Sequence, residues 1–303
     1  MATRAWHGGS AWQGRLSTGV KSRPHRKPLT LDAADDPAVW NRWYPLGAPP
    51  DIRRLGLRQT RLLNRPIDLT THKTWISAKC EYRPLPVTER LGYVWTTLGQ
   101  PDGPPPQLLE YYEVDRIVMN IWSPQIQCSG LRIIDNVVDN AHFPFVHPGV
   151  LGSTDHLEQV PATPEIDADG VLWSRSQKYW LPITCAVAEY TYRIQDPYSV
   201  ILYIHRPNRS GRFDYLGIFA QPLDEEHVIA HKLLAWVNED WIDPKKLRSD
   251  QQKISAQDKF ILDRSFPPTL PISGVDRSVG VDNPSLAYRA WLRDLGVRYG
   301  TYK

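Results

Sequence analysis

The run YSVILYIHRPNRSGRFDYLGIFAQPLDEEHVIAHKLLAWV, residues 198–237, gives the clearest indication of the fold. It contains three stretches rich in β-branched and aromatic residues, separated by short links with Gly, Pro, Asn and Asp. These stretches are residues 198–204, 215–220 and 228–237. Short links predict antiparallel pairing, because parallel strands need a long crossover. In the last strand, His231 and every second residue after it should share one face of the sheet.

The same pattern continues toward the N-terminus of the chain. Further strands are predicted at residues 117–122, 171–176 and 186–194, and a hairpin at 87–98 that turns near Arg90-Leu91-Gly92. Helices are predicted at about 131–141, 244–262 and 284–295, the last with Asp282-Asn283 as its capping signal. Together these elements indicate an α+β fold with an antiparallel sheet and a few long helices.

The proline-rich stretch Gln100–Pro106 is the best domain boundary in the chain. It separates a β region, 39–100, from a larger domain, 101–303. Residues 1–38 are polar, show no periodicity and include the basic cluster 21–28. They are either an arm that packs on another subunit or a disordered tail.

Composition narrows the class of protein. Of 303 residues, 41% are hydrophobic and 23% charged, and the net charge of +3 is small, so nothing demands a nucleic acid or a membrane as partner. No apolar run is long enough to span a bilayer, and Arg4 is not followed by the apolar stretch of a signal peptide. Three widely spaced cysteines argue against a disulfide framework and favour buried free thiols. We therefore expect a cytoplasmic protein.

The segment DNVVDNAHFPFVHPG, residues 135–149, carries the chemistry. Asp139 and His142 lie three residues apart and would share a helix face, Pro144 would end the helix, and His147 could return to the same point. Two histidines and one carboxylate are the usual ligands of a non-haem Fe(II) that reacts with O₂. Asn136 would stand on the same polar row, and such a row in a buried helix needs partners. A pair of histidines at this spacing is, however, often only structural.

A third, acidic ligand must come from elsewhere. Asp258, in the helix predicted at 244–262, shares a face with Gln251 and Ser255, one or two turns earlier. By spacing alone, Asp258 is better interpreted as a surface residue beside Lys259. For Gln251 and Ser255, a position in a pocket and a solvent-facing side of the helix are equally compatible with the spacing.

The motif Asn136-x-x-Asp139-x-x-His142-x-x-x-x-His147 resembles the mononuclear iron motif of Rieske-type non-haem iron oxygenases. Gln257-Asp258-Lys259 is similar to the later acidic motif of that family. Residues 288–293, YRAWLR, resemble the ending of its N- and O-demethylase branch, while 42–47 and 87–95 resemble the two ends of its Rieske domain. The resemblance covers about residue 40 to the C-terminus.

The resemblance implies a helix-grip (START-like) antiparallel sheet wrapped around long helices, preceded by a small all-β remnant of a Rieske domain. It also implies that His142, His147 and Asp258 bind Fe(II). In the family, the aspartate at the position of Asp139 carries electrons from a neighbouring cluster to the iron, and Asn136 would line the iron site.

One departure is large: the chain lacks the C-x-H and C-x-x-H pairs that a Rieske cluster needs, and only Cys80 lies in the region. Among family members, the methylxanthine N7-demethylase type of catalytic subunit has this form. The resemblance then implies a [2Fe-2S] cluster supplied in trans by a Rieske-domain-containing reductase that uses NADH. It further implies O₂ as oxidant, a small planar substrate and a possible trimer.

The expected reaction is hydroxylation of an N-methyl group, which releases formaldehyde. Gln251 and Ser255 are the candidate substrate-binding residues, and the amide of Gln251 would suit a purine-dione edge. Trp122, Trp236 and Trp241 could stack a flat ring, although a core position is favoured for each. His156, His205, His227 and His231 are interpreted as structural or surface residues.

Two alternatives stay open. The chain could be an aromatic-ring hydroxylase or O-demethylase on the same scaffold, or a non-catalytic assembly subunit. The second is disfavoured, because a decayed subunit has no physical need to keep three buried polar ligands.

Overall fold

The computed structural model describes residues 31–182, 185–205, 211–239, 242–273 and 282–302. The basic cluster 21–28, most of the predicted arm, and Trp241 lie outside the described residues.

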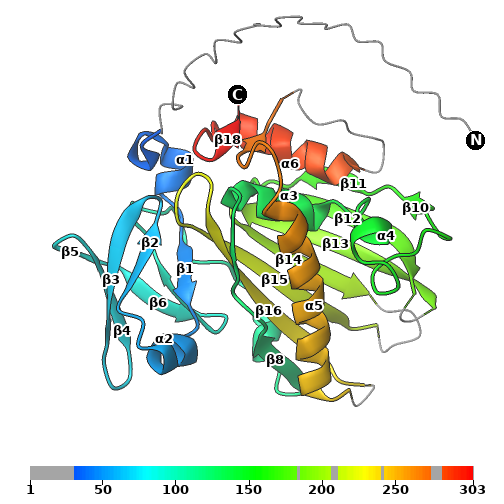
Figure 1. Ribbon diagram of the computed structural model, residues 1–303, viewed down its shortest axis with the longest axis horizontal. Coiled ribbons are helices and arrows are strands. Elements are labelled where there is room, and N and C mark those ends of the chain that lie inside the picture. Colours follow the sequence, from blue (N-terminus) through cyan, green and yellow to red (C-terminus); the bar gives the residue numbers. More distant parts are fainter. Residues whose placement is uncertain (1–30, 183–184, 206–210, 240–241, 274–281, 303) are drawn as a thin grey trace, which may run out of the picture. The chain divides into compact units, whose positions relative to one another are not determined.

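The dominant element is a large antiparallel sheet, shown in green and yellow in Figure 1. Its strands are β8 (Arg116–Asn120), β9 (Gln125–Ile126), β10 (Gln159–Val160), β11 (Thr163–Ile166), β12 (Leu172–Leu181), β13 (Ala186–Asp196), β14 (Ser199–His205), β15 (Phe213–Pro222) and β16 (Val228–Val237). The main path runs β10-β12-β13-β14-β15-β16-β8, with β11 beside β12 and β9 beside β16. The predicted antiparallel sheet is confirmed, and β16 has the predicted bounds.

The two faces of β16 differ in what they meet. His231 lies against Tyr93, with ring centroids 5.2 Å apart, and Leu233 packs in the same cluster. Lys232 and Leu234 have the opposite parity, and the Lys232 ammonium reaches a helix on the other side. The predicted alternation along this strand is therefore confirmed.

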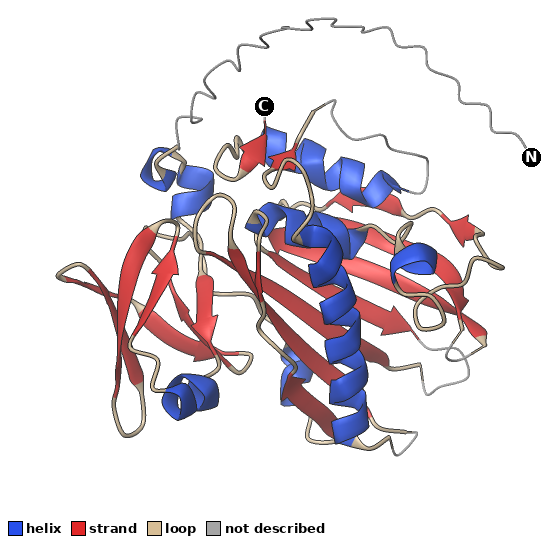
Figure 2. Ribbon diagram, in the orientation of Figure 1, coloured by secondary structure: helices blue, strands red, loops and turns tan. Residues whose placement is uncertain are grey.

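The helices lie over one face of the large sheet (Figures 1 and 2). They are α3 (Gly130–Val138), α4 (Phe143–Val146), α5 (Pro244–Leu262) and α6 (Asn283–Asp294). α5 has the predicted bounds, and α6 differs by one residue at each end. Three residues of α5 are buried, Leu247, Ile254 and Leu262, and polar contacts also hold the helix; for example, the Gln252 amide donates to the Ile121 carbonyl.

The helix predicted at 131–141 is shorter than expected. α3 ends at Val138, because Asp139 adopts an extended conformation (φ −86°, ψ 106°) and its Oδ1 accepts a hydrogen bond from the Ala141 amide at 2.8 Å. Such a local side-chain bond competes with helix formation. Asp139 and His142 thus do not share a helix face, and Pro144 lies in the first turn of α4 instead of ending α3.

Two smaller sheets precede the large one in sequence. β1, β7 and β6 form the first, and β2 to β5 form the second. Their bounds, with those of the short helices around them, are η1 (Ala33–Asp35), α1 (Pro37–Trp40), β1 (Tyr44–Gly47), α2 (Pro49–Leu55), β2 (Gln59–Leu62), β3 (Arg65–Thr71), β4 (Ile76–Cys80), β5 (Arg83–Leu85), β6 (Val87–Arg90), β7 (Tyr93–Thr96) and η2 (Leu109–Tyr112). The predicted hairpin is confirmed as β6–β7, with Leu91 and Gly92 at positive φ in its turn. A last parallel pair joins β17 (Leu270–Pro271) to β18 (Thr301–Tyr302).

Two expectations about individual side chains were wrong. Trp122 follows β8 in a loop and is 39% exposed, so it is not a core residue. All three cysteines are free, and Cys128 is buried as expected, but Cys185 sits exposed in the turn before β13. Among the described residues, no helix combines the length and apolar character needed to cross a membrane.

Candidate metal centre

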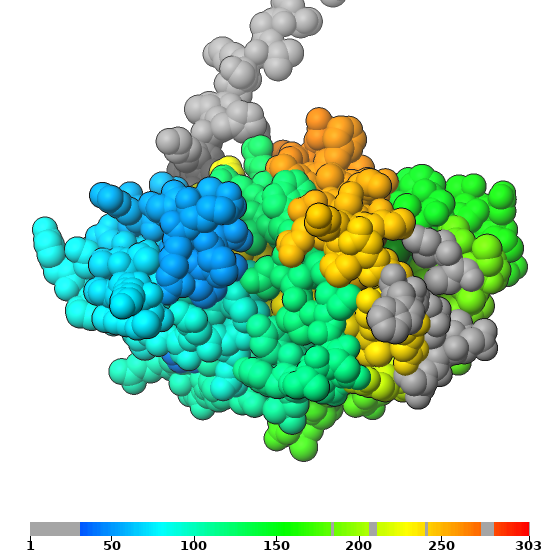
Figure 3. Space-filling model, turned by 90° about the horizontal axis from the view of Figure 1, so that it is seen from below, coloured from blue at the N-terminus to red at the C-terminus, as the bar shows by residue number. Residues whose placement is uncertain are grey.

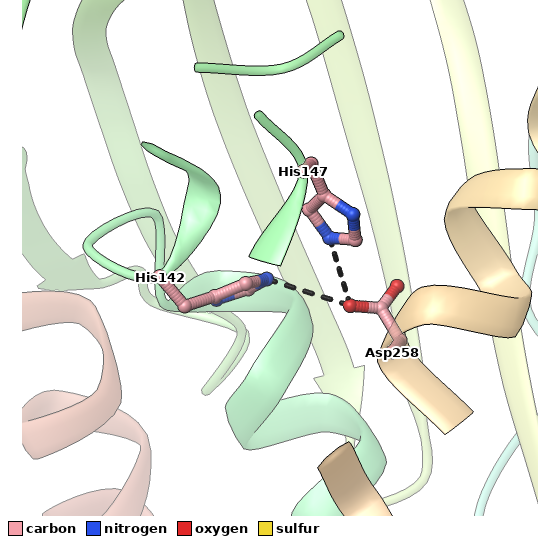
Figure 4. A group of neighbouring side chains, drawn as sticks. All are labelled: His142, His147 and Asp258. Carbon is pink, nitrogen blue, oxygen red and sulfur yellow. Dashed lines mark hydrogen bonds and ion pairs between the residues drawn. The ribbon is translucent and has the colours of Figure 1, made fainter. Parts of the chain in front are cut away.

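His142, His147 and Asp258 converge on one point between α4 and α5 (Figure 4). One potential ligand atom from each lies within 4.8 Å of the others. His147 Nε2 is 2.9 Å from Asp258 Oδ1, and His142 Nε2 is 3.5 Å from the same oxygen. The sequence motif and the distant aspartate are therefore brought together in space.

The short helix α4 explains why the two histidines meet. His142 is its N-cap residue and His147 its C-cap residue, and a single turn of helix returns the chain to the same side. The loop after His147 folds back tightly onto this turn: a Cβ built on Gly152 would lie 2.5 Å from the Pro144 nitrogen, so only glycine fits there.

His147 is held by two partners. It is fully buried, and its Nδ1 donates to Gln257 Oε1 at 2.9 Å. With Nδ1 used in this way, Nε2 is the nitrogen that faces the centre and would serve as the metal ligand, which is the arrangement seen around metal-ligating histidines. Gln257 precedes Asp258 on α5, so one turn of that helix supplies both a candidate ligand and the group that orients another.

His142 lacks such support. Only 14% of its side chain is exposed, and neither ring nitrogen makes a hydrogen bond to any described residue. Its Nδ1 lies 3.7 Å from Asp139 Oδ2. Burial disfavours the protonated ring, but the carboxylates of Asp139 and Asp258 outweigh this effect and raise the pKa of His142 to about 9.

Asp258 is the negative centre of the cluster. Burial alone would raise the pKa of its carboxyl, but the nearby rings of His142 and His147, the second hydrogen-bonded to it, lower this pKa well below its ordinary value. Asn136 Nδ2 donates to the same Oδ1 at 3.3 Å. The interpretation of Asp258 as a surface residue is thus not supported by its position.

The donor set fits a divalent transition metal. Two imidazoles and one carboxylate on one side of a point match the facial arrangement of non-haem Fe(II) sites, which leaves further coordination positions open. The His142 nitrogens, buried without hydrogen bonds in the described part of the chain, are what such an ion would satisfy.

Asp139 lies at the edge of the cluster. Its side chain is 31% exposed, and it lines a surface hollow of about 290 Å³ together with residues of α3, α5 and α6. At that hollow, Arg289 makes a two-pronged ion pair with Asp135, with N–O distances of 2.9 and 2.7 Å. Asp139, the candidate electron-entry residue, is therefore accessible to solvent and is a direct neighbour of His142.

Gln251 and Ser255 lie one or two turns before Asp258 on α5 and are both half-buried. Ser255 Oγ donates to the Gln251 carbonyl at 3.0 Å and accepts from Lys232 Nζ at 3.2 Å. Ser255 thus faces the sheet and not the solvent.

Two residues near the centre were not assigned roles from sequence. Gln257 stood in the quoted acidic motif, and its contact with His147 required the fold. The sequence does distinguish Lys232, because it is a lysine in a strand whose other residues are nearly all apolar. Of the tryptophans, Trp236 belongs to a cluster with Met119 and Leu247.

Comparison with known proteins places the chain in a family. The profile of the vanillate O-demethylase oxygenase C-terminal domain matches residues 126–298. A probable methylxanthine N7-demethylase of Pseudomonas sp. (strain TJI-51) is 33% identical over 278 residues, which cover 88% of this chain and 98% of the relative. The methylxanthine N3-demethylase of Pseudomonas putida is 26% identical over 167 residues, 54% of this chain and 46% of the relative.

Solved structures show the same fold at low sequence identity. NdmA of Pseudomonas putida CBB5 with caffeine superposes with a TM-score of 0.72 and 17% identity, covering 87% of this chain and 92% of that one. Dicamba monooxygenase bound to dicamba gives a TM-score of 0.66 and 14% identity, covering 84% and 97%. Taken with the family profile and the identity to the N7-demethylase relative, these matches show that the chain belongs to the Rieske-type non-haem iron oxygenases with a vanillate O-demethylase type C-terminal domain, and is an oxidoreductase of that family.

Proposed function

We propose that this chain is the catalytic subunit of an oxidative N-demethylase that acts on a methylxanthine, at the N7 methyl group. The observation that carries the proposal is the buried cluster of His142, His147 and Asp258. The substrate class and position are supported by the probable N7-demethylase, which matches this chain over 88% of its length.

In this proposal, His142, His147 and Asp258 would hold Fe(II). When bound, the iron supplies the site at which O₂ is activated. Gln257 fixes the tautomer of His147, and Asn136 holds the Asp258 carboxylate by donating to it. Both contacts orient ligands, because each fixes a side chain that could otherwise rotate away.

The reaction balances as follows. One oxygen atom of O₂ enters a C–H bond of the N-methyl group, and the other leaves as water after taking up two electrons and two protons. The resulting N-hydroxymethyl group breaks its C–N bond, the nitrogen regains a proton, and formaldehyde departs. The chain's own contribution is to hold the ring near the metal in a site that excludes bulk water.

The electrons are proposed to come from another protein. Asp139 is partly exposed and lies 3.7 Å from His142 Nδ1, so a Rieske domain docked over the adjoining hollow would reach the metal through it. The partner is a Rieske-domain-containing reductase that draws on NADH and supplies the [2Fe-2S] cluster in trans. This dependence on NADH supports a cytoplasmic site of action, and a trimeric assembly is the arrangement the family suggests.

The same proposal assigns a role to each of the three parts of the chain. Residues 39–100, with their two small sheets, are interpreted as a Rieske domain that has lost its cluster, and 101–303 as the catalytic domain with a helix-grip arrangement around α5. The turn of β6–β7 at Leu91-Gly92 supports the first reading, since residues 87–95 resemble the end of that domain. Residues 1–38 would form an arm.

The test combines the purified chain with defined partners. After anaerobic loading with Fe(II), it should hold close to one iron ion, and with a Rieske-bearing reductase, NADH and a methylxanthine it should release formaldehyde. With a simple flavin reductase it should be inactive. Turnover with the simple reductase would contradict the role of Asp139, and an iron content far below stoichiometric would contradict the enzyme itself.

O-demethylation of a methoxylated aromatic is the second candidate. The observation in its favour is the family profile, whose description names vanillate O-demethylase. Supplying vanillate in place of the methylxanthine in the same assay separates the two. An aromatic-ring hydroxylase would give no formaldehyde, and a non-catalytic assembly subunit would hold no iron.

A further inference from the structure

Lys232 is a cation buried beneath α5. It lies in the middle of β16, and only 6% of the residue is exposed. Its Nζ donates to Ser255 Oγ at 3.2 Å, and Ser255 stands one turn before Asp258. Lys232 therefore contacts, from the sheet side, the helix that carries the candidate ligand and the candidate substrate residues.

Among the described residues, no carboxylate forms a direct ion pair with the ammonium. Its one hydrogen-bond acceptor is a neutral hydroxyl, which in turn donates to the Gln251 carbonyl. An ammonium carries three donors, so two of them have no acceptor among the described residues. Burial lowers the pKa of Lys232 to about 8, and the charge of Asp258 opposes this effect. At neutral pH the side chain is still mostly protonated.

Such an arrangement is costly for a fold. Burying a charge without a partner destabilises the native state, and an apolar side chain of similar size serves a core better. The neighbouring His231 shows the contrast: it is neutral, and both ring nitrogens have partners, Ser123 Oγ at 2.9 Å and Gln221 Oε1 at 3.0 Å. His231 is a satisfied structural residue, whereas Lys232 has a single acceptor, Ser255 Oγ, among the residues that the structure describes.

We propose that Lys232 anchors the substrate by donating from Nζ to an oxygen acceptor on the planar ring. This inference rests on the proposed function, and it names the group that recognises the substrate. A xanthine ring carries carbonyl oxygens at C2 and C6. The C6 oxygen lies beside N7, whereas the C2 oxygen lies at the end of the ring remote from N7 and can accept from an ammonium while the N7 methyl group faces the metal. The hydrogen bond to Ser255 would keep the ammonium in position before the substrate binds.

The same chemistry fits a second source, the carboxylate of a methoxybenzoate. A charged donor in a dry site strengthens binding to either acceptor, because hydrogen bonds to charged groups are stronger than neutral ones. The two sources are therefore separated by the ligand that is offered, 7-methylxanthine or vanillate.

The test variant is Lys232→Met, which keeps an unbranched chain one atom shorter and removes the charge. The dissociation constant is measured by calorimetry on anaerobic, iron-loaded protein, so that no turnover occurs. We expect it to rise about 10- to 100-fold for 7-methylxanthine, the range for loss of a charged hydrogen bond. The iron content should stay unchanged, and the melting temperature of the ligand-free variant should rise by about 2–4 °C because an unpaired buried charge is gone.

A matched control lies on α5 itself. The outer side of this helix belongs to the molecular surface, where its residues appear in gold in Figure 3. The Lys253 side chain is 72% exposed and pairs with Asp250. Lys253→Met makes the same chemical change at the surface, and it should alter neither the dissociation constant nor the melting temperature.

The outcomes separate the anchor from the proposed function. If Lys232→Met binds 7-methylxanthine as tightly as the unmodified protein, Lys232 is not the anchor. The same follows if Lys232→Met loses stability or iron. If the unmodified protein binds vanillate but not 7-methylxanthine, and Lys232→Met loses that binding, the anchor stands and the proposed substrate is wrong. If the unmodified protein binds neither ligand, both proposals are overturned.

Discussion

Gln257 Oε1 accepts a hydrogen bond from His147 Nδ1 at 2.9 Å, so an amide on α5 fixes the ring of a histidine on α4. The contact joins segments 110 residues apart in sequence. It determines which nitrogen of His147 is free to act as a ligand, and this makes Gln257 a positioning residue for the metal.

Replacing Gln257 by Leu should weaken iron binding about 10- to 100-fold, because His147 loses the bond that fixes its tautomer. Gln257→Glu should restore the affinity, since a carboxylate also accepts from Nδ1. Both are measured by competition with a chelator. Gln252→Leu, on the same helix but bonded to the Ile121 carbonyl, is the control and should leave iron affinity unchanged. Equal affinities in all four proteins would show that the contact has no role at the metal.

Asp139→Asn should keep the iron and lose most coupled turnover. The asparagine can still accept the hydrogen bond from the Ala141 amide, so the turn before α4 is preserved, while the negative charge beside His142 is removed. The measurements are iron content and formaldehyde released per NADH consumed with the Rieske-bearing partner. Loss of iron would instead make Asp139 a structural residue.

The stability of the protein should fall on the acid side because of His231. Burial lowers the pKa of His231 to about 3 from an ordinary value of about 6.5. Between these pH values the unfolded chain binds a proton that the folded chain does not. The stabilisation is therefore complete above about pH 6.5 and is lost as the pH falls, by about 1.4 kcal/mol per unit from this group.

The check is denaturant unfolding between pH 7 and pH 4.5. The His231→Gln variant should show a shallower loss of unfolding free energy than the unmodified protein. His156→Gln, at an exposed position beside Trp180, should not change the slope. A slope unaffected by His231→Gln would mean that this histidine is protonated in the folded state.

Two buried glutamines should respond in opposite ways to replacement by Leu. Gln221 donates to Thr60 Oγ1 and to the Arg61 carbonyl, and it accepts from His231. Gln221→Leu should destabilise the fold by about 2–4 kcal/mol, because it leaves several buried groups without partners.

Gln177 is the counterpart on β12. It is fully buried, and neither atom of its amide has a hydrogen-bond partner among the described residues. Gln177→Leu should therefore be neutral or stabilise by about 1 kcal/mol, since it removes an unsatisfied polar group. Urea unfolding of both variants gives the comparison, and a large destabilisation by Gln177→Leu would show that its amide is satisfied in solution.

Much of the fold follows from local patterns. The bounds of β16 and α5 were predictable, because strand alternation and a proline at the first helical turn are signals carried by adjacent residues. The end of α3 was not, because the periodic apolar pattern continues past Val138 and only the side-chain bond of Asp139 stops the helix. Trp122 was misplaced because hydrophobicity indicates burial without indicating which loop positions the fold leaves open.

The candidate site was predictable in part for a similar reason. His142 and His147 are close in sequence, so spacing brought them together, whereas Asp258 needed either the fold or a family resemblance. Gln257 and Lys232 were invisible as site residues, because their roles depend on which face of α5 and β16 meets which neighbour.

The position of Asp258, Gln257 and Ser255 on a single helix has a mechanical consequence. α5 is a rigid rod, so a shift along its axis or a rotation about it displaces all three side chains together. The proposed metal geometry and the proposed grip on the ring therefore cannot be adjusted separately by moving this helix. To change the substrate preference and keep the iron, side chains must therefore be exchanged on a fixed backbone. The strand that carries Lys232 offers positions for such exchanges, because it does not carry the proposed ligands.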